Sequence, residues 1–213
     1  MIVAIDGPCG SGKGTIAKLL SQRLNLVNID TGATYRCLAL KVLRNNIDLS
    51  DENKIIELSR NLNVEFLDGK VILDGEDVSS VIRGKDVSSI VSPISSIVEV
   101  RSNLVLLQRK MASNYDVVLE GRDITTVVFP NADYKFYLDA SLDERVARRV
   151  RQNKELNIDM SVDEVRKNIS DRDYNDMNKP VGALKRTDEQ IYIDSSNMTI
   201  DEVVDKMISV IKK

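Results

Sequence analysis

The sequence contains no histidine among its 213 residues. That absence excludes Ser-His-Asp catalysis, histidine general bases and histidine-ligated metal centres. Chemistry that works by positioning substrates and stabilising charge, such as phosphoryl transfer, needs no histidine and remains open.

Cysteine and long apolar runs are also scarce. The two cysteines, Cys9 and Cys37, are too few for a disulfide framework, so we expect a reducing compartment. No apolar run approaches the roughly 20 residues of a transmembrane helix. The chain starts with the strand-like IVAI, not with a secretory signal. These features predict a cytoplasmic protein without a membrane partner.

The charge balance argues against a nucleic-acid partner. The formal net charge is −3, with 42% hydrophobic and 30% charged residues, which is typical of a soluble globular protein. An anionic substrate must then be held by a local cluster of Arg and Lys. We expect a monomer that binds small molecules.

Apolar runs that fit buried strands alternate with segments of helical periodicity. This alternation predicts an α/β fold with a doubly wound parallel sheet of five strands, and ligands at the strands' carboxyl ends. The expected strands are IVAI, LVNI, VVLEG, YKFYLDA and IYID. The expected helices run over 13–24, 31–45, 98–111, 141–152, 161–179 and 199–213. Ser141 with Glu144, and Ser161 with Glu164, have capping-box spacing.

The stretch VEFLDGKVILDGEDV interrupts this pattern. Its two strand-like runs are joined by Asp68-Gly69, and a second Asp-Gly pair follows at Asp74-Gly75. We therefore expect one unit over 1–213 with a core at about 1–50, 94–148 and 176–213. A small antiparallel insert would occupy about 51–93, and a mobile helical lid about 149–175.

The segment GPCGSGKGT follows the first expected strand and opens the first expected helix. It matches the phosphate-loop pattern G-x-x-x-x-G-K-[ST], except that Gly14 replaces the hydroxyl residue and Thr15 comes one place late. Consecutive backbone N–H groups at a helix N-terminus form an anion site, and Lys13 adds a charge for the terminal phosphates. Mg²⁺ would then be held largely through water, or by Thr15.

A phosphate loop alone does not name a reaction. The guanine-reading motif N-K-x-D is absent, since Asn53-Lys54, Asn153-Lys154 and Asn178-Lys179 lack the aspartate. No D-x-x-G switch motif occurs either, so a GTPase is disfavoured.

Four segments together make the chain recognisable: DGPCGSGKGT, DTGATYR, EGRDITTVVFP and RDYNDMNKPVGAL. Taken in order, they resemble bacterial cytidylate kinase over essentially the whole chain. The resemblance implies a P-loop nucleoside monophosphate kinase of pyrimidine metabolism that transfers the γ-phosphoryl group of ATP to CMP or dCMP, with Mg²⁺. It implies ATP binding by Gly7, Pro8, Cys9, Gly10, Ser11, Gly12, Lys13, Gly14 and Thr15.

The resemblance also implies acceptor-side roles. The monophosphate would be held by Thr31, Arg36 and Arg122, and the cytosine would be faced by Ser92, Arg101 and Asp123. The sugar hydroxyls would be bound by Arg172 and Asp176, and Lys179 would contact the base or the phosphate. An arginine fork donates to O2 and N3 of cytosine, whereas uracil presents N3–H there. Glu120 would help to order Mg²⁺ and its waters. Lys13, Arg122, Arg145, Arg148 and Arg149 are the candidate catalytic residues, the last three on a lid.

Four positions depart from the family pattern: Lys179 replaces arginine, Thr125 glycine, Ala183 proline, and Thr34 a larger apolar residue. Thr125 raises the main question, because a glycine there would serve a positive φ. Two other interpretations remain at this stage. One is a phosphate-loop kinase for another acceptor such as UMP or shikimate, and the other is a nucleotide sensor without catalysis.

Overall fold

A computed structural model describes residues 1–67, 69–155 and 157–212. The chain divides into two compact units. The first, unit 1, comprises Met1–Val27 and Val117–Lys213, and the second, unit 2, comprises Asn28–Asp116. The division into core, insert and lid that the sequence suggests concerns function and motion, and it stays a prediction.

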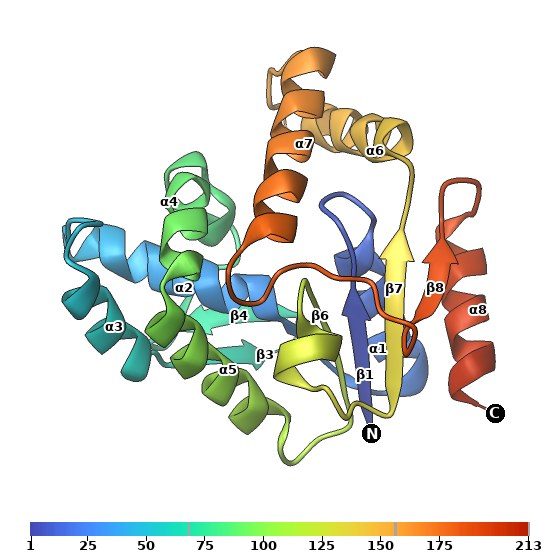
Figure 1. Cartoon of the computed structure of the whole chain (residues 1–213), viewed down its shortest axis with the longest axis horizontal. Coiled ribbons are helices and arrows are strands. Elements are labelled where there is room, and N and C mark those ends of the chain that lie inside the picture. Colours follow the sequence, from blue (N-terminus) through green and yellow to red (C-terminus); the bar gives the residue numbers. More distant parts are fainter. Residues whose placement is uncertain (68, 156, 213) are drawn as a thin grey trace. The chain divides into compact units, whose positions relative to one another are not determined.

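A parallel sheet organises the fold (Figure 1). Its strands are β1 (Ile2–Asp6), β2 (Val27–Asp30), β6 (Val117–Gly121), β7 (Tyr134–Asp139) and β8 (Ile191–Asp194), in the order β2-β6-β1-β7-β8. The registers Asp6↔Gly121 and Asp6↔Tyr137 align the carboxyl ends of β6, β1 and β7 at one edge. The predicted five-stranded doubly wound α/β fold is confirmed.

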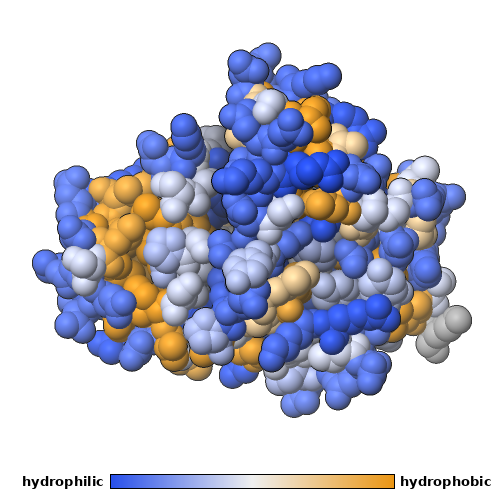
Figure 2. Space-filling view, turned by 45° about the horizontal axis from the view of Figure 1, so that its top comes forward, coloured by the Kyte–Doolittle hydropathy of each residue, from blue (hydrophilic) through white to orange (hydrophobic). Residues whose placement is uncertain are grey.

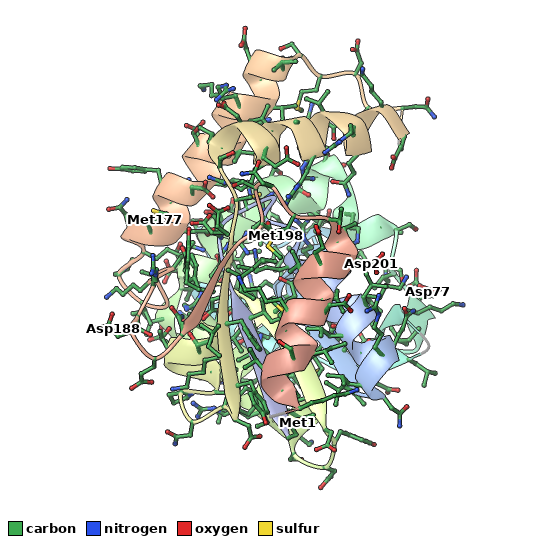
Figure 3. All side chains as sticks on the ribbon, turned by 90° about the vertical axis from the view of Figure 1, so that its right-hand side faces the viewer. Met1, Asp77, Met177, Asp188, Met198 and Asp201 are labelled. Atoms are coloured by element: carbon green, nitrogen blue, oxygen red, sulfur yellow. The ribbon has the colours of Figure 1, made fainter. Side chains whose placement is uncertain are left out.

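Two helices of unit 1 pack against the sheet. In α1 (Lys13–Leu24) and α8 (Ile200–Ile211), apolar residues recur at helical spacing and are buried against strand residues such as Val3, Phe136 and Ile193. Arg23 of α1 forms ion pairs with Asp201 and Asp205 of α8. Asp201, labelled in Figure 3, lies in the first turn of α8. This face of the sheet is therefore closed by packing and by an ion-pair cluster.

The helices α6 (Leu142–Glu155) and α7 (Val162–Asn178) lie side by side (Figure 1). Val146, Val165 and Ile169 form a small core between them. The capping box predicted for Ser161 and Glu164 is present at the start of α7. At Ser141 only half of the predicted box forms: its hydroxyl accepts from Glu144 N–H, while its own N–H donates to Ser196.

Unit 2 is largely helical, with α2 (Thr31–Arg44), α3 (Glu52–Arg60), α4 (Lys85–Ser96) and α5 (Val98–Ala112) around one apolar core. Fully buried Leu38, Ile55 and Leu104 come from three of these helices. Figure 2 shows a broad apolar area over this part of the chain, whereas the region of α6 and α7 is mostly hydrophilic. The exposed apolar residues of unit 2 include Val98 and Leu106 of α5.

The predicted hairpin is also present in unit 2. Strands β3 (Val64–Leu67) and β4 (Lys70–Leu73) pair antiparallel, and β5 (Glu76–Asp77) adds a short third strand. Asp74 and Gly75 have φ of 50° and 87°, which suits the two-residue turn between β4 and β5. In the first turn, Gly69 has φ of 75°, and Asp68 lies outside the described residues.

Two helices were not expected from the sequence. Helix α3 starts at an Asp51 cap, and α4 continues through Pro93, a residue that normally interrupts a helix. A short 3-10 turn (Val81–Arg83) precedes α4. Both helices are amphipathic, and they bury Ile55, Val87 and Ile94 in the unit 2 core.

Within the described residues, no single helix combines the length and apolar character needed to cross a membrane. Helices α4 and α5 meet these criteria only as a pair, and they are bent by 101° relative to each other.

Candidate active site

The phosphate loop connects β1 to α1 at the carboxyl edge of the sheet. Gly12, just before α1, has φ of 94°, and Gly10 has φ of 80°. A Cβ on Gly7 would lie 2.0 Å from the Leu138 carbonyl oxygen of β7. The glycines therefore allow the loop to turn tightly against the sheet, as the sequence pattern predicts.

Lys13 lies inside this loop. Its Nζ donates to the Pro8 carbonyl at 2.8 Å and to Ser11 Oγ at 3.3 Å, and the residue is only 5% exposed. Burial lowers the pKa of Lys13 to about 8, with a further contribution from the positive charge of Arg122, while Glu120 opposes the shift. The ammonium is thus held at the loop, where an anionic ligand would favour its charged form.

All three arginines predicted for the lid contact the phosphate loop. Arg145 donates to the Cys9 carbonyl at 2.9 Å, and Arg148 donates to the Ser11 carbonyl at 3.1 Å. Arg149 Nη2 lies 4.0 Å from Cys9 Sγ. Burial raises the pKa of the Cys9 thiol, but Arg172, Arg122 and Arg149 more than offset it, so the pKa is lowered. The lowered pKa of Cys9 reflects the positive charges that surround the loop.

The turn that follows β6 is fixed by Asp6, the last residue of β1. The Asp6 carboxylate is fully buried and accepts from Ile124 N–H at 2.8 Å, Thr125 N–H at 2.9 Å and Thr125 Oγ1 at 2.6 Å. Burial raises the pKa of Asp6, and the hydrogen bonds from Thr125 and Ile124 oppose the rise. This network holds the π-helical turn Ile124–Val128 directly after Arg122 and Asp123.

Thr125, which stands where the family pattern has glycine, does not need a positive φ. It is not one of the described non-glycine residues with positive φ, so a threonine is accommodated without strain. Its hydroxyl also accepts a hydrogen bond from Gln190, which is 7% exposed. The substitution therefore adds a buried bridge between the turn after β6 and the segment before β8.

Arg122 and Asp176 form a half-buried ion pair, with Arg122 Nε 2.6 Å from Asp176 Oδ2. Lys179 Nζ lies 3.2 Å from the other carboxylate oxygen, so the lysine that replaces arginine still reaches this group. Burial opposes both charges, but Arg122 and Lys179 keep the pKa of Asp176 below its usual value. Burial likewise opposes the charge on Arg122, and the pair with Asp176 raises its pKa. Asp123, beside Arg122, is 6% exposed, and Arg172 lies on the exposed side of α7.

Unit 2 carries the remaining predicted residues. Thr31 is the first residue of α2 and is 4% exposed. Arg36, one turn further on, donates to the Ile82 carbonyl at 3.2 Å and to Ser88 Oγ at 2.8 Å. The structure therefore brings the beginning of α2 together with α4.

The expected base-reading residues lie where α4 meets α5. Arg101 is 5% exposed, donates to the Ser95 carbonyl at 3.3 Å, and lies 5.6 Å from the centre of the Tyr35 ring. Ser92 is exposed, three residues before Ser95. The packing on Tyr35 fixes the plane of the guanidinium, which a directional contact to a base requires.

Thr34 has a role that its pattern did not reveal. Its hydroxyl donates to the Thr31 carbonyl at 2.7 Å and accepts from Gln108 at 2.9 Å, in a fully buried position. A larger apolar side chain would leave Gln108 without this acceptor. The change from an apolar residue is thus compensated by a polar partner on α5.

Three residues that hold the site, Asp6, Asp173 and Gln190, were not predicted from the sequence. Asp173 accepts from Cys9 N–H at 3.0 Å and pairs with Arg145, although 164 residues separate it from Cys9. The only local signal for Asp173 is the acidic character of RDYND, a stretch in which the family resemblance assigns a role to Arg172 and Asp176. Asp6 and Gln190 gave no signal beyond polar residues beside apolar strands.

A parallel sheet with a phosphate loop, a buried lysine and a set of arginines defines a phosphate-loop kinase. The fold agrees with solved structures: shikimate kinase from Bacteroides thetaiotaomicron superposes with a TM-score of 0.52 over 100% of this chain and 99% of that one, at 14% identity. A family model, Cytidylate kinase, matches residues 3–213.

Curated relatives extend over nearly the same length. A cytidylate kinase of Alkaliphilus oremlandii is 45% identical over 99% of this chain and 97% of its own. One from Clostridium acetobutylicum is 46% identical over the same shares. The chain belongs to the cytidylate kinase family. As a member, it is an enzyme that transfers the γ-phosphoryl group of ATP to CMP or dCMP.

Proposed function

We propose that unit 1 binds ATP through the phosphate loop and that the acceptor CMP or dCMP is recognised by the residues predicted from the sequence. The observation that carries this proposal is the convergence of Lys13, Arg145, Arg148 and Arg149 on one glycine-rich loop. A triphosphate matches that charge. The loop supplies backbone donors and the side chains supply the positive groups.

Catalysis then rests on position and charge. The attacking group is a phosphate oxygen that is already ionised, so no strong base is needed. Lys13 and Arg122 neutralise the charge on the transferred group, and the α6 arginines exclude water from it. Because a sensor needs no second phosphate site, Arg36 and Arg122 favour transfer over sensing.

Mg²⁺ fits this site as a partner of the nucleotide. Among the described residues, no group of three acidic, cysteine or histidine side chains could hold a metal ion. A Cβ on Gly14 would lie 3.5 Å from Glu120 Oε1, so the place of the usual hydroxyl faces a carboxylate. We propose that Glu120 and exposed Thr15 hold Mg²⁺ largely through water, as this ion prefers, and that Mg²⁺ offsets phosphate charge.

On the acceptor side, Thr31, Arg36 and Arg122 hold the phosphate, and Arg172 and Asp176 the sugar hydroxyls. Asp176 is paired with Arg122 and Lys179. An acceptor phosphate would replace Asp176 as the partner of Arg122 and leave the carboxylate to accept from a sugar hydroxyl. Ser92, Arg101 and Asp123 face the cytosine. We also propose that the protein works as a monomer in the cytoplasm; Cys9 and Cys37 form no disulfide, which suits a reducing compartment.

Arg101→Met tests the acceptor assignment. Methionine keeps much of the apolar stem that packs on Tyr35 but removes the donor fork. We expect the KM for CMP to rise by roughly tenfold or more, because hydrogen bonds from charged groups are lost. The KM for ATP should stay within about twofold, and the preference for CMP over UMP should fall.

Arg109→Met is the matched control, since Arg109 is exposed on the same helix. It should leave both KM values unchanged. If Arg101→Met keeps a normal KM for CMP and a normal preference over UMP, Arg101 does not read the base.

A further inference from the structure

The phosphate loop is held from outside by a charged pair on α6 and α7. Asp173 Oδ1 accepts from Cys9 N–H at 3.0 Å, and Arg145 Nη1 donates to the Cys9 carbonyl at 2.9 Å. Asp173 and Arg145 are themselves paired, with side chains 12% and 9% exposed. Both backbone groups of one loop residue are thus bound by the two members of a single ion pair.

The ion pair supplies the backbone hydrogen bonds that a strand or helix would otherwise supply to Cys9. Cys9 lies between β1 and α1, where its buried N–H and carbonyl have no ladder partner. Buried backbone groups require partners, so their conformation follows the groups that satisfy them. Arg145 is anchored further by its Nε, which donates to the Ala140 carbonyl at 3.0 Å. The Arg145 side chain is therefore fixed at both its Nε and its Nη1 groups.

The ion pair also solves an electrostatic problem. A lone carboxylate beside a phosphate site would repel the ligand. Arg145 offsets the charge of Asp173, so the carboxylate holds the loop without opposing an anion. Removing either partner would leave the other charge buried and uncompensated.

We propose that Asp173 is a positioning residue for phosphoryl transfer: it fixes the Cys9 peptide of the phosphate loop and ties helix α7 to the ATP site. This inference rests on the proposed role of the loop in ATP binding. Asp173 touches neither nucleotide in this account. It acts through the loop and through Arg145.

The two cysteines supply a direct readout, because Cys9 lies in the loop and Cys37 in the core of unit 2. Both are free and buried, at 3% and 0% exposure. Burial raises the pKa of Cys37 to about 12, which keeps its thiol unreactive near neutral pH. Labelling of Cys9 therefore reports opening of the loop, and labelling of Cys37 reports unfolding.

The experiment labels the full chain, without nucleotide, with an aromatic disulfide reagent and identifies the modified cysteine by peptide mass. In Asp173→Ala, we expect Cys9 to react roughly tenfold faster or more, with Cys37 still protected. Asp173→Asn keeps an acceptor for the Cys9 N–H and should fall between wild type and alanine. Asp171→Asn, on the exposed side of the same helix, should match wild type.

Steady-state kinetics complete the test. Asp173→Ala should raise the KM for ATP by roughly tenfold and leave the KM for CMP within about twofold. An unchanged Cys9 rate in a folded Asp173→Ala variant would overturn the proposal, and so would an unchanged KM for ATP. Labelling of the wild-type protein in the presence of Mg-ATP tests the proposed function separately. If ATP does not slow the labelling of Cys9, ATP binding at the loop is contradicted, whatever the result for Asp173→Ala.

Discussion

At the scale of single residues, buried polar side chains hold the charged groups of the site in place. The Asp6 carboxylate accepts from Thr125, 119 residues further along the chain. The Thr125 hydroxyl donates to Asp6 and accepts from Gln190, so it links the turn after β6 to the segment before β8. Lys13 is held in the same way, by the Pro8 carbonyl and Ser11 Oγ.

Lys13 provides a prediction for pH. Its pKa is lowered to about 8, and bound phosphates would raise it again. ATP should therefore bind about tenfold more weakly at pH 9 than at pH 7, because binding must then restore the proton. Titration calorimetry or fluorescence with Mg-ATP at several pH values measures this.

The same shift affects stability in the opposite direction. Between about pH 8 and 10.5 the unfolded chain keeps the Lys13 proton that the folded chain releases. The cost of burying the Lys13 charge therefore falls, and the free energy of unfolding rises, as the pH increases through this range. Weaker ATP binding at pH 9 would thus not reflect loss of fold through Lys13. Cys9→Ser is the control for the nearby thiol. A dissociation constant that stays flat from pH 7 to 9 would refute the Lys13 account.

At the scale of elements, the strands and most helices followed from apolar periodicity and capping residues. The predicted helix at Lys13 begins and ends where the structure has it, and both Asp-Gly pairs mark turns of the small sheet. Helices α3 and α4 were not predicted, because the two Asp-Gly pairs led us to expect an antiparallel insert over about 51–93, and because proline is locally unfavourable inside a helix. Their stability comes from the unit 2 core, which tertiary packing alone creates.

The capping box of α8 permits a stability prediction. Thr199 Oγ1 accepts from Glu202 N–H at 3.2 Å, and Glu202 accepts from Thr199 N–H at 2.8 Å. Since α8 packs on the sheet, Thr199→Ala should lower the free energy of unfolding by about 1 kcal/mol. Urea denaturation measures it. Ser209→Ala, at an exposed position of the same helix, should change stability by less than about 0.5 kcal/mol. Equal effects of the two variants would contradict the cap's role.

At the scale of the whole molecule, family membership assigns the reaction, transfer of the γ-phosphoryl group of ATP to CMP or dCMP. The sequence alone was sufficient for the class of enzyme, because its four motifs are spread over the entire chain. The residues that give each motif its geometry, such as Asp173 and Gln190, required the structure. Acceptor selectivity is the part of the proposed function that depends most on Arg101, whose guanidinium packs on the Tyr35 ring.

The most direct measurement is ADP release from Mg-ATP with CMP, dCMP, UMP, AMP and GMP supplied separately. We expect rapid turnover with CMP and dCMP, weak turnover with UMP and none with the purine monophosphates, because an arginine fork matches the acceptor edge of cytosine. Equal turnover with UMP or a purine would contradict the base-reading assignment. ATP binding without turnover on any acceptor would contradict phosphoryl transfer itself.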